Sequence, residues 1–196
     1  MIKIIIFDWG EVLCFYRKTF FRTIATKYKI NYALFRKVEL ENRLKHEAGE
    51  ISTTQFVQNI NRACHSPISV HNYYTLHSHF VHLNKGMIKI IQQLKKKGYK
   101  IFLLSNNSEP TYNYIKDQKD LHKLFDKILF SYQIGLKKPD PHFFQHVLKD
   151  ENIRFSQCLF VDDRSDSVVA AKKLGMSALQ YTNLKKFKHD LAKLIL

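Results

Sequence analysis

The chain contains little cysteine and no long apolar run. Its three cysteines, Cys14, Cys64 and Cys158, are odd in number and lack CxxC spacing, which argues against a disulfide framework or a cysteine metal site. We expect reduced thiols in the core, and a reducing cytoplasm as the compartment. No apolar stretch could span a bilayer. The apolar N-terminus is interrupted by Asp8 and has no small-residue cleavage site, so no secretory signal is predicted.

Glycine and proline are also scarce, with six and four residues, and no Gly/Pro-rich linker divides the 196 residues. This length fits one α/β domain with a small insertion, and 45% hydrophobic residues suffice for a core.

Acidic residues are few, with 17 Asp and Glu against 32 Lys and Arg, giving a formal net charge of +15. Such a charge favours anionic partners, either phosphorylated substrates or nucleic acid. However, only seven of the basic residues are Arg, the lysines are spread along the chain, and no arginine-rich or aromatic RNA-binding motif is present. We therefore expect a solvated lysine-rich surface and no nucleic-acid partner.

Several apolar runs end on small polar or acidic residues. The first covers residues 1–7 and ends at Asp8, and similar runs occupy residues 101–105, 127–131 and 158–163. Runs of this kind are typical of buried parallel strands, which need no polar face. Open α/β sheets carry their active sites at the carboxyl ends of such strands.

The order of the patterns predicts the fold. Strands alternate with helical patterns after residue 83, which indicates an α/β fold with a doubly wound parallel sheet. Residues 15–82 show helical spacing, with no strand expected before about residue 81, and a Ser52 to Gln55 capping box opens one of four short helices. We predict a core of residues 1–14 and 83–196, with residues 15–82 inserted over the carboxyl edge as a lid.

Four groups of polar residues fall at the predicted edge: Asp8, Ser105 with Asn106, Lys138, and Asp162 with Asp163. Taken singly, each could be a turn or cap residue. Together they can perform phosphoryl transfer, because a carboxylate attacks phosphorus while a hydroxyl and a lysine hold the transferring oxygens. A further carboxylate can hold a divalent cation, and magnesium suits an all-oxygen site.

The same residues lie in four motifs: Phe7-Asp8-x-Gly10-x-Val12-Leu13, Leu104-Ser105-Asn106, Gly135-x-x-Lys138-Pro139-Asp140-Pro141, and Asp162-Asp163. In this order they resemble the motifs of the haloacid dehalogenase (HAD) superfamily. The resemblance covers essentially the whole chain, and the helical insertion is similar to that superfamily's first cap type. Within the superfamily the chain is similar to a small bacterial subgroup that includes sugar-phosphate phosphatases.

The resemblance implies a Rossmann-like core and a role for each motif. Asp8 would be the nucleophile that forms an aspartyl phosphate, and Lys138 the charge-stabilising lysine. Ser105 and Asn106 would bind phosphate. Mg²⁺ would be held by Asp8, by the backbone carbonyl of Gly10 and by Asp163, with Asp162 in support.

Two positions depart from the family pattern. Gly10 stands where phosphatases of this type commonly carry an aspartate that acts as general acid and base. Loss of such a group typically removes about 10²–10⁴ in rate, so the proton would have to come from elsewhere, with Glu11 as the nearest candidate, or activity would be confined to good leaving groups. A glycine with positive φ here would also resist a side chain. Ser167 stands where the family often has Asp or Asn, which predicts a weaker metal site.

The predicted function is a magnesium-dependent phosphomonoester hydrolase acting on a small phosphorylated metabolite. A carbon–halogen hydrolase of the same superfamily would also use an aspartate nucleophile, but it would need no metal and therefore no Asp162-Asp163 pair. A catalytically weakened binding protein is the other alternative, suggested by Gly10 and Ser167.

Overall fold

The central strand is β1 (Ile4–Phe7), which is fully buried because it lies between two helical layers. The computed structural model describes residues 1–16 and 19–195. Five parallel strands form the main sheet in the order β5-β4-β1-β6-β7. The other four are β4 (Lys100–Ser105), β5 (Lys127–Phe130), β6 (Cys158–Asp162) and β7 (Ser177–Gln180). Thus β1 lies between the strands that lead to Ser105 and to Asp162.

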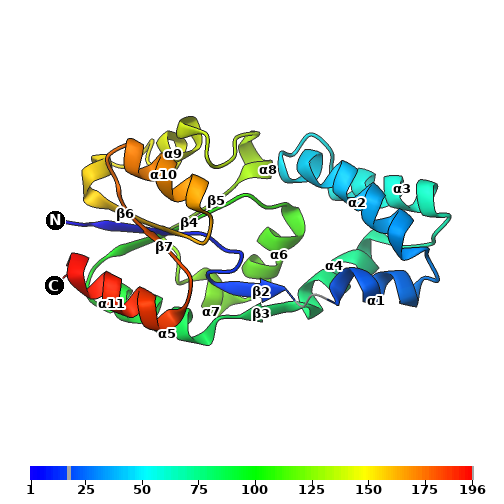
Figure 1. Cartoon of the computed structure of the whole chain (residues 1–196), viewed down its shortest axis with the longest axis horizontal. Coiled ribbons are helices and arrows are strands. Elements are labelled where there is room, and N and C mark those ends of the chain that lie inside the picture. The colour runs from blue at the N-terminus through cyan, green and yellow to red at the C-terminus, as the bar shows by residue number, and fades with distance from the viewer. Residues whose placement is uncertain (17–18, 196) are drawn as a thin grey trace.

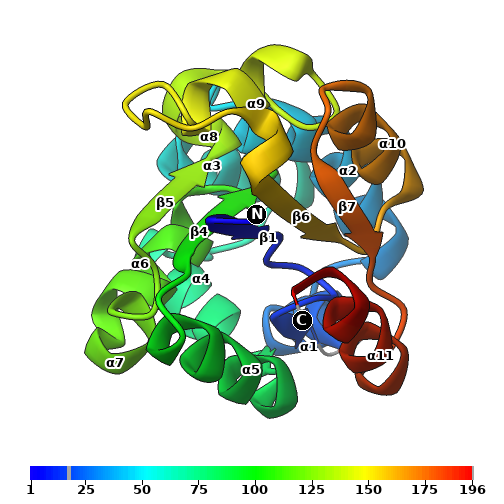
Figure 2. The same ribbon diagram turned by 90° about the vertical axis from the view of Figure 1, so that its left-hand side faces the viewer.

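Helices cover both faces of this sheet (Figure 2). They are α5 (Lys85–Lys96), α6 (Glu109–Asp117), α7 (Lys119–His122), α8 (Ser131–Ile134), α9 (Pro141–Val147), α10 (Ser165–Lys173) and α11 (Leu184–Ile195), with a 3₁₀ turn at Phe155–Gln157. Side chains alternate along β1, so Ile5 and Phe7 pack with α5 and α11 while Ile4 and Ile6 pack with α9 and α10. The predicted doubly wound α/β fold is confirmed. No helix in the described ranges has the length and apolarity to cross a membrane.

Four further helices lie beyond the carboxyl ends of the strands, on the right in Figure 1. They are α1 (Phe20–Lys27), α2 (Tyr32–Glu47), α3 (Thr53–Cys64) and α4 (Val70–His79). They enclose a separate hydrophobic cluster that includes Phe35, Phe56 and Ile60. The capping box from Ser52 to Gln55 opens α3 as predicted, whereas α2, with 16 residues, is longer than the short helix expected.

The expectation of no strand between residues 15 and 81 is wrong at both ends of that range. Strand β2 (Cys14–Tyr16) pairs antiparallel with β3 (Val81–Leu83), so the two chain segments that join the helical unit to the sheet lie side by side. Three residues are too few for a period-of-two pattern to emerge from a sequence. The pairing gives the helical unit a two-stranded connection to the core.

Candidate active site

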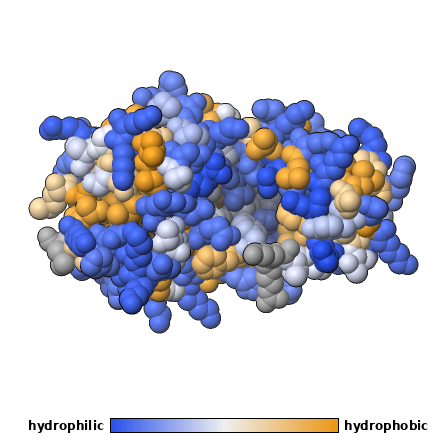
Figure 3. Space-filling view, in the orientation of Figure 1, coloured by the Kyte–Doolittle hydropathy of each residue, from blue (hydrophilic) through white to orange (hydrophobic). Residues whose placement is uncertain are grey.

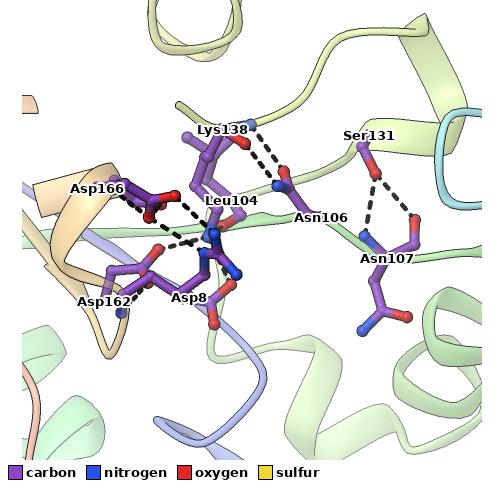
Figure 4. Close-up of polar contacts among 10 residues, drawn as sticks. Asp8, Leu104, Asn106, Asn107, Ser131, Lys138, Asp162 and Asp166 are labelled. Carbon is purple, nitrogen blue, oxygen red and sulfur yellow. Dashed lines mark hydrogen bonds and ion pairs between the residues drawn. The ribbon is translucent and has the colours of Figure 1, made fainter. Parts of the chain in front are cut away.

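Lys138 lies at the centre of the site, where its ammonium group is fully engaged. Its Nζ donates to Asp8 Oδ1 at 2.6 Å, to Asp162 Oδ2 at 2.7 Å and to the Leu104 carbonyl at 2.9 Å (Figure 4). All three donors of the ammonium are therefore used. The side chains of Lys138, Asp8 and Asp162 are at most 10% exposed. A buried cation thus bridges two buried carboxylates from different strands.

The sheet brings these two carboxylates together. Phe7 on β1 is in register with Val161 on β6, so the next residues, Asp8 and Asp162, emerge side by side at the carboxyl edge. The Asp8 amide also donates to the Val161 carbonyl at 2.9 Å, which continues the ladder by one residue. Asp162 is further fixed because its Oδ1 accepts from the Arg164 amide at 2.8 Å.

Asn106 fixes the loop that carries Lys138. Its carboxamide accepts from the Lys138 amide and donates to the Lys138 carbonyl, both at 2.7 Å (Figure 4). The side chain predicted to bind phosphate therefore positions the lysine, through its oxygen and one of its two amide hydrogens. Ser105, the last residue of β4, is 2% exposed and lies one residue beyond the Leu104 carbonyl that Lys138 contacts.

The electrostatics of the cluster follow from burial. Burial raises the pKa of Asp8, aided by Asp162 and opposed by Lys138. Burial lowers the pKa of Lys138, but the Asp8 and Asp162 carboxylates outweigh it and raise that pKa above its usual range. Burial, together with the Asp8 and Asp162 carboxylates, raises the pKa of Asp163 to about 6. One lysine does not neutralise three carboxylates, so the site attracts a further cation.

The donor set fits Mg²⁺. Asp8, Asp162 and Asp163 each offer an oxygen within 4.8 Å of the others. Magnesium holds oxygens at about 2.1 Å, so ligands opposite each other lie about 4.2 Å apart, and small side-chain rotations suffice. Both oxygens of Asp162 already accept hydrogen bonds, from Lys138 and from the Arg164 amide. Asp8 and Asp163 are thus better placed than Asp162 to hold the ion, and Asp162 orients Lys138.

Gly10 does not have the positive φ that the sequence left open. A Cβ built on it would meet only Asp8 Oδ2, at 3.9 Å, so the backbone and the space both accept a side chain. Glu11, the candidate proton source, has the left-handed φ of 56° and is exposed. It lines an open hollow together with Asp163 and Gln180.

Ser167 is fully buried in the first turn of α10. Its amide donates to Asp166 Oδ1 at 2.8 Å, and its hydroxyl lies 3.4 Å from the same oxygen. Asp166 in turn forms a two-point ion pair with Arg164, at 3.1 and 2.6 Å. The Asp166 carboxylate is therefore engaged outside the cluster formed by Asp8, Asp162 and Asp163.

A cavity of about 310 Å³ lies between the helical unit and the loop after β4, and the sequence did not reveal its lining. Asn107 and Ser108 form its floor, directly after the predicted phosphate-binding pair. A signal was present in α2, where Glu39 and His46 fall on the face defined by Phe35 and Val38, and both are buried. Ionisable residues on a buried helix face commonly mark a site.

Comparisons with known proteins give a consistent picture. A family model described as haloacid dehalogenase-like hydrolase matches residues 2–175. The chain is 25% identical over 215 residues to a D-ribitol-5-phosphate phosphatase of Bacteroides thetaiotaomicron, covering 100% of this chain and 99% of that protein. It is 32% identical over 97 residues to a sesquiterpene phosphatase of Aspergillus oryzae, covering 50% of each chain. A HAD family enzyme of Bacteroides thetaiotaomicron, solved with magnesium and inorganic phosphate, has a TM-score of 0.77 and 21% identity, covering 93% of this chain and 95% of that one.

Proposed function

The chain belongs to the haloacid dehalogenase-like hydrolases, and from this premise we propose that it is a magnesium-dependent phosphatase of small phosphate monoesters, with Asp8 as nucleophile. The observation that carries the proposal is Lys138, whose ammonium lies 2.6 Å from Asp8 and 2.7 Å from Asp162, with Asp163 in the same cluster. The full-length similarity to a ribitol phosphate phosphatase and the magnesium and phosphate bound to a structural relative support it.

In the proposed reaction, a carboxylate oxygen of Asp8 attacks phosphorus as the bond from phosphorus to the alcohol oxygen breaks. This leaves an aspartyl phosphate, which water then hydrolyses to free Asp8 and inorganic phosphate. Lys138 holds the Asp8 carboxylate in place and balances charge on the phosphoryl oxygens. The Ser105 hydroxyl and the backbone amide of Asn106 would hold those oxygens. Mg²⁺ held by Asp8, Asp163 and the Gly10 carbonyl would neutralise phosphoryl charge.

We also propose that residues 15–82 act as a cap. Besides the connection through β2 and β3, a hydrogen bond to α2 and another from α3 join this unit to the core. The Ser131 hydroxyl donates to the Glu47 carbonyl at 2.5 Å, and the Thr53 hydroxyl donates to Glu109 at 2.9 Å. The cap would enclose the substrate's alcohol portion and keep bulk water out during attack.

A phosphate-release screen over many phosphorylated metabolites, with magnesium and with a chelator, tests the proposal. Magnesium-dependent release would support it. A carbon–halogen hydrolase would instead release halide from a 2-haloacid and ignore the chelator. No turnover of either class of compound, together with unaltered affinity for phosphate esters, would favour a binding protein.

The first prediction concerns the pH dependence of magnesium binding. The pKa of Asp163 is raised from 3.8 to about 6 on folding, so this group's contribution to stability is present at low pH and is lost as pH rises through 6. Mg²⁺ binds the ionised carboxylates. We therefore expect the gain in melting temperature on adding magnesium to increase between about pH 5 and pH 7.5.

Two buried histidines require a differential measurement. Burial lowers the pKa of both His46 and His77 to about 4, so their contribution to stability has the opposite sign and is lost as pH falls. The measured quantity is therefore the melting temperature with magnesium minus that with chelator, at each pH. Asp163→Asn should abolish most of this difference. A gain that is independent of pH, or that survives in Asp163→Asn, would contradict the assigned ligand.

The second prediction concerns the missing acid. Gly10→Asp should raise kcat/KM for an alkyl phosphate at least about tenfold, because a carboxyl there can protonate a poor leaving group. An aryl phosphate, whose oxygen leaves without much protonation, should gain little. The open space and ordinary φ at Gly10 mean that the variant should fold. Gly10→Asn, which matches the size without the proton, is the control.

Equal gains in Gly10→Asp and Gly10→Asn would contradict this explanation. Glu11→Gln supplies a second check. The Glu11 side chain is exposed and does not line the cavity between the helical unit and the loop after β4, so its loss should change the rate by less than about threefold. A failure of Gly10→Asp combined with a large loss in Glu11→Gln would assign the proton to Glu11.

A further inference from the structure

The cavity of about 310 Å³ lies where the alcohol portion of a phosphate ester would be placed. Figure 3 shows the surface hollowed between the lobe of the sheet and the lobe of the four helices. Asn107 and Ser108 line the cavity and follow Ser105 and Asn106 on the same loop. A phosphate held at that pair would thus project its ester oxygen towards the cap. The volume is at the small end of ligand cavities.

Rings of Phe and Tyr supply half of the residues on the cap side of this cavity. They are Tyr16, Phe20, Phe21, Phe56 and Tyr73. His46 stacks on the Phe56 ring with centroids 4.5 Å apart, and His77 lies edge-on to Phe20 at 6.1 Å. Ring faces cannot satisfy hydroxyl groups, and each buried hydroxyl left without a partner costs about 1–3 kcal/mol. A flat apolar ring, by contrast, gains from packing against them.

Three polar atoms of the histidine and tyrosine rings at the cavity are already engaged within the protein: His46 Nε2, the Tyr16 hydroxyl and His77 Nε2. His46 Nε2 lies 3.0 Å from the Thr53 hydroxyl, which itself donates to Glu109. The Thr111 hydroxyl lies 3.1 Å from the Tyr16 hydroxyl and 3.3 Å from His77 Nε2. These contacts reduce the hydrogen-bonding capacity that the ring residues offer to the several hydroxyls of a polyol.

The charged residues of the cavity disfavour a substrate whose alcohol portion is itself anionic. Glu39 and Glu47 contribute two carboxylates, while Arg43 contributes one guanidinium, 3.9 Å from Glu39 and 3.8 Å from Glu47. Arg36, 2.5 Å from Glu39, offsets the second carboxylate, but its guanidinium lies over the Phe21 ring. Buried His46 and His77 are neutral at pH 7 and add no positive charge. Among the residues that the structure describes, the cavity lining offers a second phosphate or a carboxylate on the substrate no cation that is not already paired with a carboxylate.

We propose that this cavity selects phosphate monoesters whose alcohol portion is a small, uncharged aromatic ring system, in preference to sugar or polyol phosphates. The inference rests on the proposed phosphatase function. It is also consistent with Gly10, because phenolic oxygens leave without a strong general acid. The specificity differs from that named for the relative of similar length, a D-ribitol-5-phosphate phosphatase.

Three substrates separate the inference from the function on which it rests. Acetyl phosphate has a good leaving group that is too small to fill the cavity, so its hydrolysis reports the chemistry at Asp8 alone. Benzyl phosphate and ribitol 5-phosphate both release alkyl alcohols, so they differ mainly in what fills the cavity. We expect kcat/KM for benzyl phosphate to exceed that for ribitol 5-phosphate at least about tenfold, which corresponds to about 1.4 kcal/mol.

A variant of the cavity lining provides a second measurement. Phe21 is only partly buried, and Phe21→Leu keeps an apolar side chain while removing the ring. This change should lower the ratio of kcat/KM for benzyl phosphate to that for acetyl phosphate by about three- to tenfold. Phe155→Leu is the matched control, since Phe155 is partly buried beside the amino end of β6, far from the cavity, and the ratio should stay as in the wild type.

The outcomes are distinct. Hydrolysis of acetyl phosphate with equal or better use of ribitol 5-phosphate than of benzyl phosphate would overturn the inference and leave the phosphatase standing. An unchanged ratio in a folded Phe21→Leu protein would also overturn it. Absence of magnesium-dependent acetyl phosphate hydrolysis would overturn the proposed function itself, and the inference with it.

Discussion

Asp8→Asn is expected to lower phosphate release by at least about 10⁴-fold without loss of the fold. The amide has nearly the shape of the carboxylate but does not attack phosphorus and is a poor magnesium ligand. Its oxygen can still accept from Lys138, which in addition retains Asp162 and the Leu104 carbonyl. Burial raises the pKa of Asp8, so its ionised form destabilises the metal-free fold at neutral pH. The melting temperature of the metal-free variant should therefore be no lower than that of the wild type.

Two further measurements make this prediction specific to the nucleophile. Wild-type protein quenched in acid during turnover of acetyl phosphate should gain the mass of one phosphoryl group, and Asp8→Asn should not. Asp190→Asn applies the same chemical change to a carboxylate paired with Lys186 on α11, and it should leave both readouts intact. Rapid hydrolysis by a folded, pure Asp8→Asn protein would show that another group attacks phosphorus.

The sequence predicted the strands and their shared edge because buried parallel strands have a simple signature. The apolar runs that end at Asp8, Ser105 and Asp162 became β1, β4 and β6, and their carboxyl ends meet as expected. With these three strands adjacent, the register of β1 with β4 and with β6 brings their last residues to the same edge. The short strands β2 and β3 were missed because six residues in two separate places carry no periodic pattern.

Side-chain partners could not be predicted in the same way. Nothing in the sequence indicates that the Asn106 carboxamide forms hydrogen bonds with the backbone of Lys138, 32 residues later. Those bonds depend on the path that the loop before α9 takes over the carboxyl edge of the sheet. The φ of Gly10 is likewise a property of the folded turn. The aromatic cavity depends on four helices packing together, so its residues read in sequence as ordinary core positions.

Lys138→Ala is expected to lower both the stability and the rate. It leaves the buried carboxylates of Asp8 and Asp162 without their cation, and breaking a buried ion pair on one side costs about 3–5 kcal/mol. The rate should fall at least about 10²–10³-fold, because phosphoryl charge loses its fixed partner. Lys138→Met keeps much of the side-chain volume and separates the loss of charge from the loss of packing. Lys137→Met removes the same charge from the exposed neighbour and should behave as the wild type.

The pH dependence distinguishes lost charge from general damage. Without Lys138 the Asp8 carboxylate loses the charge that opposes the effect of burial, so its pKa rises further on folding, and stability is retained at low pH and lost as pH increases. The deficit in melting temperature of Lys138→Met should therefore be larger at about pH 7.5 than at about pH 5. Adding Asp162→Asn should restore stability, since only one buried carboxylate then lacks its partner, yet activity should stay low. A deficit independent of pH, or a double variant no more stable than Lys138→Met, would mean that Lys138 supports the fold by packing alone.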